Sequence, residues 1–147
     1  MIPRTIQAVL GQLATQYPVI TVTGPRQSGK TTLCRHVFKH MPYVNLENPD
    51  VREFARTDAR GFLANYPSGA IIDEIQRVPD LVSYLQPLVD ETNKPGQFIL
   101  TGSQQFEVMT TITQSLAGRT ALLKLLPLSI EELQSKAMTL SIDELLL

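Results

Sequence analysis

The residues whose types and spacing could do chemistry begin with one glycine-rich segment. It reads Gly24, Pro25, Arg26, Gln27, Ser28, Gly29, Lys30, Thr31 and Thr32, which is the spacing of a phosphate-binding loop, or P-loop. Glycines let backbone N–H groups surround a polyphosphate where a Cβ would obstruct the approach. We expect Lys30 to reach the β- and γ-phosphates of ATP and the Thr31 hydroxyl to bind Mg²⁺. The alternative is a glycine-rich turn with a solvated lysine.

Two carboxylates form the second group of chemical interest. Asp73 and Glu74 close an apolar run at 70–72, and a continuous apolar run is typical of a strand buried inside a parallel sheet. Ligands of such sheets bind at the carboxyl ends of the strands, so both acids should lie near the P-loop. Asp73 would then hold the Mg²⁺, and Glu74 would act as the general base that activates a water molecule. The alternative is a pair of solvated acids at a strand end.

A hydroxyl and an arginine complete the candidates. Ser103 closes the apolar segment 97–103. If this strand lies between the P-loop strand and the Asp73 strand, Ser103 would sense the γ-phosphate or orient water. It is favoured over Thr101, with Gln104 as a further candidate, and a turn that caps the next helix is the alternative. Arg119 follows a helix end, where it is either a finger that stabilises charge on a neighbour's phosphate or a surface cation.

Periodicity and turn residues predict the elements that must position these groups. Apolar strands are expected at 19–23, 43–47, 70–74, 97–103 and 120–126. Helices are expected at 6–13, at 32–40, after Asn48 and Pro49, after Pro79 and Asp80, and at 108–116, with capping boxes at Ser129 and Ser141. The charged residues of 50–60 read as a solvated helix face, and Cys34 as a core residue. The alternation predicts one α/β domain with a mostly parallel five-stranded sheet and helices on both faces.

Whole-chain properties exclude several classes. The chain has 147 residues, a net charge of −1 and one cysteine, so an internal disulfide and a multi-cysteine metal site are excluded. The near-neutral charge gives no long-range attraction to nucleic acid or to an anionic membrane, although a neutral total is compatible with a local basic patch. No basic or aromatic-rich stretch indicates nucleic acid. No apolar run is long enough to cross a membrane and the first residues lack a signal-peptide core, so the cytoplasm is the expected location.

Four motifs stand in order along the chain, at 24–32, 72–79, 100–104 and 115–119. Together they resemble the N-terminal AAA-type ATPase domain of a widespread group of predicted prokaryotic ATPases in the AAA+ P-loop NTPase superfamily. The resemblance implies a three-layer sandwich with sheet order 5-1-4-3-2, ATP and Mg²⁺ as ligands, the roles given above for the P-loop and the two acids, and an arginine-finger position for Arg119. In that group a helical lid and a C-terminal domain follow, so residues 1–147 are expected to form a single nucleotide-binding domain that stops before them.

The predicted function is Mg²⁺-dependent ATP binding and hydrolysis by a P-loop ATPase, with water activated by Glu74 attacking the γ-phosphate. ATP and ADP are the expected ligands, and a homo-oligomer would bring Arg119 to a neighbour's site. A nucleotide-gated interaction module with little or no turnover is the alternative. A P-loop kinase is a third reading, although the sequence shows no acceptor-site signature and a kinase does not need Glu74.

Overall fold

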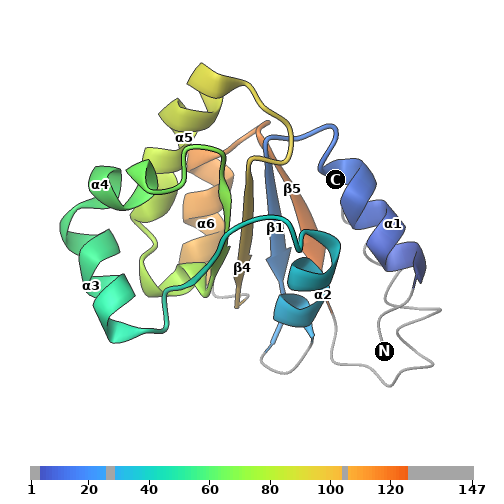
Figure 1. Ribbon diagram of the computed structural model, residues 1–147, viewed down its shortest axis with the longest axis horizontal. Helices are drawn as coiled ribbons and strands as arrows, with labels where there is room; N and C mark the ends of the chain where they lie inside the picture. The colour runs from blue at the N-terminus through green and yellow to red at the C-terminus, as the bar shows by residue number, and fades with distance from the viewer. Residues whose placement is uncertain (1–3, 26–28, 104–105, 126–147) are drawn as a thin grey trace.

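Five parallel strands form the middle layer of the protein, whose computed structural model describes residues 4–25, 29–103 and 106–125. The strands are β1 (Val19–Thr23), β2 (Tyr43–Asn45), β3 (Ala70–Asp73), β4 (Phe98–Gly102) and β5 (Thr120–Lys124). Their order across the sheet is β2-β3-β4-β1-β5, and every pair is parallel. The predicted order 5-1-4-3-2 is therefore confirmed, with β4 between the P-loop strand and the Asp73 strand. All five carboxyl ends lie at one edge (Figure 1).

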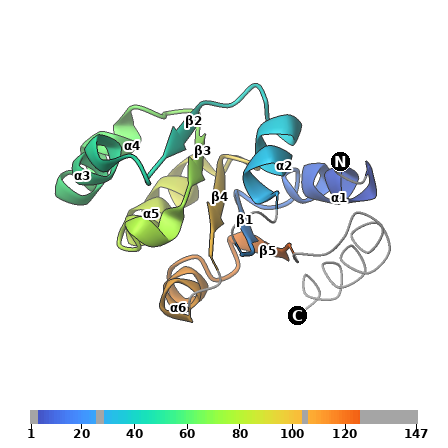
Figure 2. The same cartoon turned by 90° about the horizontal axis from the view of Figure 1, so that it is seen from below.

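Helices cover both faces of this sheet (Figure 2). The helices are α1 (Arg4–Leu13), α2 (Lys30–Val37), α3 (Pro49–Thr57), α4 (Ala59–Ala64), α5 (Leu81–Thr92) and α6 (Phe106–Ser115), and η1 (Ile75–Arg77) is a 3₁₀ turn. Residues of α1 and α2 share one hydrophobic core with the sheet, and residues of α3 to α6 share the other. The longest of these helices, α5, has 12 residues. In the described part of the chain, no helix is long and apolar enough to cross a membrane.

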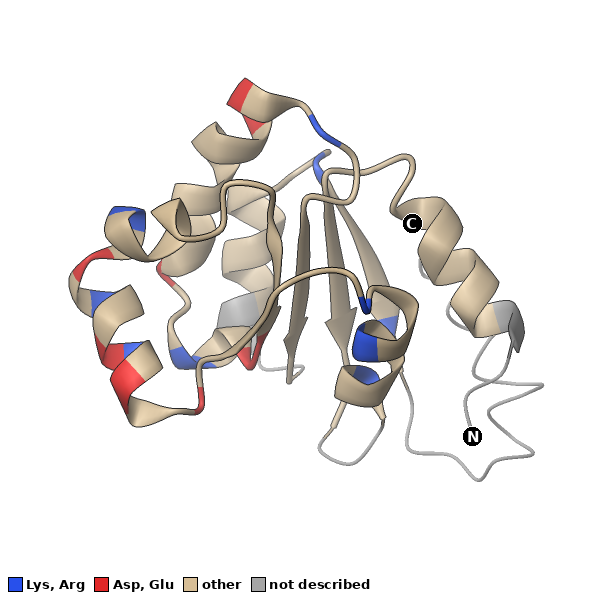
Figure 3. Cartoon of the chain, viewed as in Figure 1, with Lys and Arg blue, Asp and Glu red and all other residues tan. Residues whose placement is uncertain are grey.

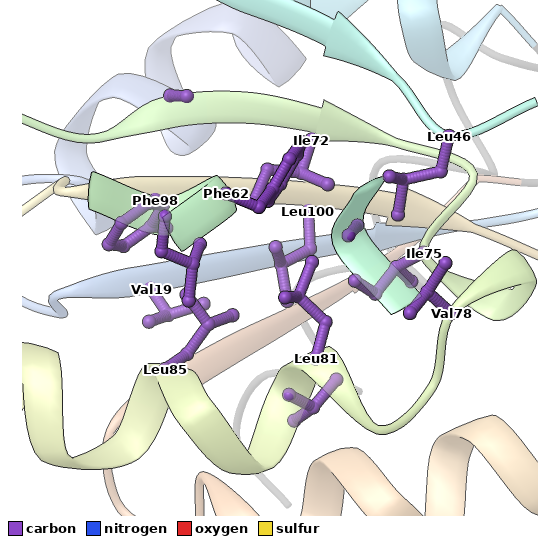
Figure 4. Packing of buried hydrophobic residues seen from close by; sticks show 14 of the residues in the cluster. Val19, Leu46, Phe62, Ile72, Ile75, Val78, Leu81, Leu85, Phe98 and Leu100 are labelled. Carbon is purple, nitrogen blue, oxygen red and sulfur yellow. The ribbon is translucent and has the colours of Figure 1, made fainter. Parts of the chain in front are cut away.

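Alternate side chains of the strands point to opposite faces, which divides the buried residues between the two cores. On the α5 side, Leu81 and Leu85 pack against Ile72, Phe98 and Leu100 from β3 and β4 (Figure 4). On the other side, buried residues of α1 and α2 pack against the intervening strand residues, with Ile6, Leu10, Leu33, Cys34, Ile20, Ile71 and Ile99 in this second core. The sheet is thus covered on both faces by helices, and the carboxyl ends of its strands lie together at one edge.

The element boundaries differ from the predicted ones at several ends. The helix after the P-loop begins at Lys30 and ends at Val37, rather than spanning 32–40, because Gly29 takes a left-handed φ of 86° that starts the helix directly after the loop. Asn48 caps α3 as expected, since its side chain accepts hydrogen bonds from Asp50 N and Val51 N. A short additional helix, α4, is absent from the prediction; its six residues are too few to give a helical pattern in the sequence. The predicted capping boxes at 129 and 141 lie outside the described residues.

Candidate nucleotide-binding site

The P-loop joins the end of β1 to the start of α2. The Gly24 N–H donates to the carbonyl of Gly102 at 3.2 Å, which ties the start of the loop to the end of β4. Lys30 is the first residue of α2 and is only 5% exposed. Its Nζ donates to the carbonyl of Pro25 at 3.2 Å, so the ammonium group lies back against the loop that is predicted to hold the phosphates. The predicted loop residues Arg26, Gln27 and Ser28 fall outside the described part of the chain.

The Asp73 carboxylate lies at the end of β3, directly beside the start of α2. It is 3% exposed, and Thr31 Oγ1 donates to both of its oxygens at 3.1 Å. The hydroxyls of Tyr43 and Thr101 also donate to it. The two residues predicted to bind Mg²⁺, Thr31 and Asp73, are therefore in contact although they are 42 positions apart in the sequence. Their donor atoms are all oxygens, which suits a hard cation such as Mg²⁺.

Tyr43 and Thr101 are partners of Asp73 that the sequence patterns do not predict. Burial raises the pKa of the Tyr43 phenol well above its ordinary value, and the hydrogen bond to Asp73 raises it further, so this hydroxyl stays a donor at neutral pH. The guanidinium of Arg35 also stacks on the Tyr43 ring, 4.2 Å from its centre. Both hydroxyls come from neighbouring strands, and the β2-β3-β4 order alone brings them to Asp73. Thr101, the less favoured candidate for sensing phosphate, contacts Asp73 and the backbone of Glu74.

The Glu74 carboxylate is held by a side-chain amide that is not among the predicted site residues. Gln76 Nε2 donates to Glu74 Oε1 at 2.5 Å, and Gln76 Oε1 accepts from Ser103 N at 3.2 Å. Glu74 itself stands in the left-handed region, with a φ of 63°. Gln76 thus connects the predicted general base to the end of β4. Ser103 Oγ is buried and has no hydrogen-bond partner among the described atoms.

An open cavity of about 720 Å³ lies along the carboxyl edge of the sheet. Three of the predicted site residues line it: Lys30, Glu74 and Ser103. The other described residues of its wall are Glu47, Arg52, Arg56, Gln76 and Arg77. Lys30, Glu74 and Ser103 therefore line one cavity. Arg52 and Arg56, interpreted as part of a solvated helix face, also line it; Arg56 is exposed and Arg52 is half-buried. Thr32 is exposed on α2, and Thr31 is half-buried.

Cys34 lies behind the site, in the core shared by α2 and the sheet. It is fully buried, as predicted. Burial, reinforced by the negative charge of Asp73 and opposed by the charge of Lys30, raises the pKa of the Cys34 thiol from 9.0 to about 12. The thiol is therefore neutral at physiological pH and acts as a small apolar residue.

Arg119 lies at the opposite edge of the sheet from the cavity. Its carbonyl accepts a hydrogen bond from Val19 N, at the start of β1, whereas the P-loop follows the end of β1. Its guanidinium binds Asp90 through two hydrogen bonds of 2.5 and 2.9 Å, and also donates to the Ala117 carbonyl at 3.0 Å. The hydrogen bond between the pair lowers the pKa of Asp90 and raises that of Arg119. Arg119 thus does not contribute to the cavity of its own chain.

Comparisons with known proteins agree with this geometry. Uncharacterized proteins of Mycobacterium bovis and Mycobacterium tuberculosis are each 38% identical to the chain over 121 residues. These residues cover 82% of the chain but 27% of either relative, so the chain spans about a quarter of the length of these curated relatives. A crystal structure of a DNA replication initiation factor matches 82% of the chain, and 44% of its own, with a TM-score of 0.53 at 14% identity, which shows a shared fold.

The sequence also matches a family model. The model is described as an AAA domain and matches residues 16–134, which include both acids, the P-loop and Arg119. Together with the parallel sheet and its strand order, this confirms the resemblance and the sheet order that it implies. The chain belongs to the AAA domain family of P-loop ATPases.

Proposed function

We propose that this protein binds ATP with Mg²⁺ and hydrolyses it. The observation that carries the proposal is the contact between Thr31 and Asp73, because it joins the residue after the P-loop lysine to the acid that ends β3. A loop that binds phosphates and an oxygen-rich metal site have to be adjacent for a metal to reach both the protein and the phosphates.

Binding would use the backbone of 24–31 and two side chains. Loop amides and the start of α2 would hold the phosphates, and Lys30 would move from the Pro25 carbonyl to the β- and γ-phosphates. Thr31 and Asp73 would hold the Mg²⁺, whose charge, when it is bound, neutralises the β- and γ-oxygens. The hydroxyls of Tyr43 and Thr101 each donate to one oxygen of Asp73 and would keep that carboxylate in place, with lone pairs left for the metal.

Hydrolysis would use the carboxylate of Glu74. It would accept a proton from a water molecule as the water oxygen attacks the γ-phosphorus, while the bond between that phosphorus and the oxygen it shares with ADP breaks. Ser103, with a buried hydroxyl that has no described partner, would contact the γ-phosphate or the water. Arg119 would stabilise charge on the phosphate of a neighbouring subunit, since it lies far from the cavity of its own chain.

Two substitutions test these assignments. Lys30→Ala is expected to abolish binding of a fluorescent ATP analogue, whereas Glu74→Gln is expected to retain binding and to lower phosphate release by about 100-fold or more. Lys39→Ala is the matched control, because Lys39 is an exposed lysine just after the same helix. If Lys30→Ala bound the analogue as tightly as the unmodified chain, the nucleotide site would be wrongly assigned.

Phosphate release also separates hydrolysis from the alternative of a nucleotide-gated interaction module. A rate per subunit that rises with protein concentration would indicate hydrolysis in an oligomer. Binding without release at every concentration would favour the module. The same measurement on the longer relatives would show how much of their activity resides in this domain.

A further inference from the structure

The cavity at the carboxyl edge has more positive charge than a P-loop requires. Its described wall contains four cations, which are Lys30, Arg52, Arg56 and Arg77, and two carboxylates, Glu47 and Glu74. The wall therefore has an excess of two positive charges in a chain whose net charge is −1. Figure 3 shows basic segments on α2 and both basic and acidic segments on α3.

These cations lie at two different ends of the cavity. Lys30 begins the helix that follows β1, while Arg52 and Arg56 are on the helix that follows β2. β1 and β2 are three positions apart in the sheet, which is roughly 14 Å at the usual spacing of strands. The γ-phosphate of an ATP on the P-loop would contact Lys30, so the arginine end of the cavity is left for another anion.

The arginines are only partly neutralised by their neighbours. Arg77 pairs with Glu47 at 3.3 Å. Arg56 donates to the Arg77 carbonyl at 3.3 Å and lies 3.9 Å from Glu53. Arg52 is half-buried, and its side chain has no hydrogen bond or ion pair with any other described residue. Because Arg52 also lines the open cavity, its guanidinium is available to donate hydrogen bonds to an anion that enters there.

The chemistry of the wall indicates which anion it is suited to bind. Arg52 and Arg56 are four positions apart on one face of a helix, about 5–6 Å between their Cβ atoms. Planar guanidinium groups bind phosphate oxygens through paired hydrogen bonds. No aromatic side chain lies among the described lining residues, so the wall would contact phosphate groups rather than stack on bases.

We propose that Arg52, Arg56 and Arg77 form a second phosphate-binding site, which holds a phosphate ester of another molecule beside the γ-phosphate of ATP. The position relative to ATP rests on the proposed function, while the arginine site itself does not. The phosphate can come from a nucleic-acid strand or from a small phosphorylated compound, because both present the same oxygens. Neither the charge composition of the chain nor its membership of the AAA domain family predicts this second site.

The test compares Arg52→Gln/Arg56→Gln with Arg60→Gln. Arg60 is an exposed arginine on α4 that lines a different groove, so Arg60→Gln is a control for the loss of one arginine charge away from the cavity. Each protein is first titrated with a fluorescent ADP analogue, and the affinities are expected to agree within about twofold. It is then saturated with Mg²⁺ and a non-hydrolysable ATP analogue, which occupies the P-loop. Pyrophosphate is added in a calorimeter, and a fluorescein-labelled single-stranded oligonucleotide is followed by anisotropy.

The double variant is expected to bind at least one probe about tenfold or more weakly than the unmodified chain, while Arg60→Gln is unchanged. Weaker oligonucleotide binding identifies a nucleic-acid backbone if the slope of log K against log salt also falls, by roughly 0.7 for each phosphate that the variant no longer neutralises. Weaker pyrophosphate binding alone identifies a small phosphorylated ligand. The proposal is overturned if neither probe binds the unmodified chain, or if the double variant binds both as well as the control.

Failure of the proposed function would be recognised separately. If the ADP analogue does not bind the unmodified chain, the nucleotide assignment fails. The two probes are then added to Lys30→Ala, in which the P-loop lysine is absent. Arginine-dependent binding to that variant supports the second site, and its absence overturns it.

Discussion

The amide of Gln76 is predicted to set the rate of hydrolysis by holding the Glu74 carboxylate. Gln76→Ala removes the hydrogen bond to Glu74 Oε1 and the one from Ser103 N. A hydrogen bond to a charged group contributes about 1.5–3 kcal/mol. If all of it orients the base in the transition state, its removal lowers the rate constant by about tenfold to 150-fold, since each 1.36 kcal/mol is about a factor of ten.

A second substitution should produce the same effect without touching Gln76. A Cβ at Gly102 would lie 2.8 Å from Gln76 Oε1 and 2.9 Å from Ile75 Cγ2, both shorter than real contacts. The amide is the flexible end of a side chain, so Gly102→Ala is expected to displace it. Gln114→Ala, at an exposed position on α6, is the control.

Phosphate release and nucleotide affinity are measured on the same samples. We expect kcat to fall for Gln76→Ala and Gly102→Ala while the affinity for a non-hydrolysable analogue stays within about twofold, because Gln76 contacts the base and not the P-loop. A fall in affinity with kcat unchanged would show that Gln76 serves nucleotide binding, and no change in either would refute the reasoning.

Two further predictions concern Arg119 and Cys34. Arg119→Ala and Glu74→Gln should each be inactive alone. Their mixture should recover phosphate release, because a Glu74→Gln subunit can supply Arg119 to the intact site of an Arg119→Ala subunit. A mixture without activity would argue against action between subunits. Burial and the charge of Asp73 raise the pKa of the Cys34 thiol from 9.0 to about 12. Between these values the unfolded chain has released this proton and the folded chain has kept it, so urea titrations should show stability falling with pH by up to about 1.4 kcal/mol per unit, and Cys34→Ala should lack this part of the slope.

The strands could be predicted from the sequence because buried parallel strands leave continuous apolar runs, whereas their order follows from the family resemblance. The apolar runs before Asp73 and before Ser103 each predicted a strand with a site residue at its end. The structure places these two strands, β3 and β4, side by side. The structure places Lys30 against the Pro25 carbonyl and Thr31 against Asp73, while their roles toward phosphate and Mg²⁺ stay predictions.

Other site features depend on contacts between distant residues, which local patterns do not reveal. The role of Gln76 follows from its two hydrogen-bond partners, and one of them, Ser103, is 27 positions away in the sequence. Arg52 and Arg56 have the spacing of any solvated helix face, and only the position of α3 beside β2 brings them to the cavity. The pairing of Arg119 with Asp90 likewise joins residues 29 positions apart.

The backbone of Glu74 has a consequence for engineering. A residue other than glycine in the left-handed region costs roughly 1–2 kcal/mol, and Glu74 stands there with a φ of 63°. Glycine at this position would remove that cost, so a screen that selects variants for heat resistance would favour it. The selected protein would unfold at a higher temperature but would lack the carboxylate of the proposed general base. At position 74, thermal stability and catalytic rate therefore favour different residues.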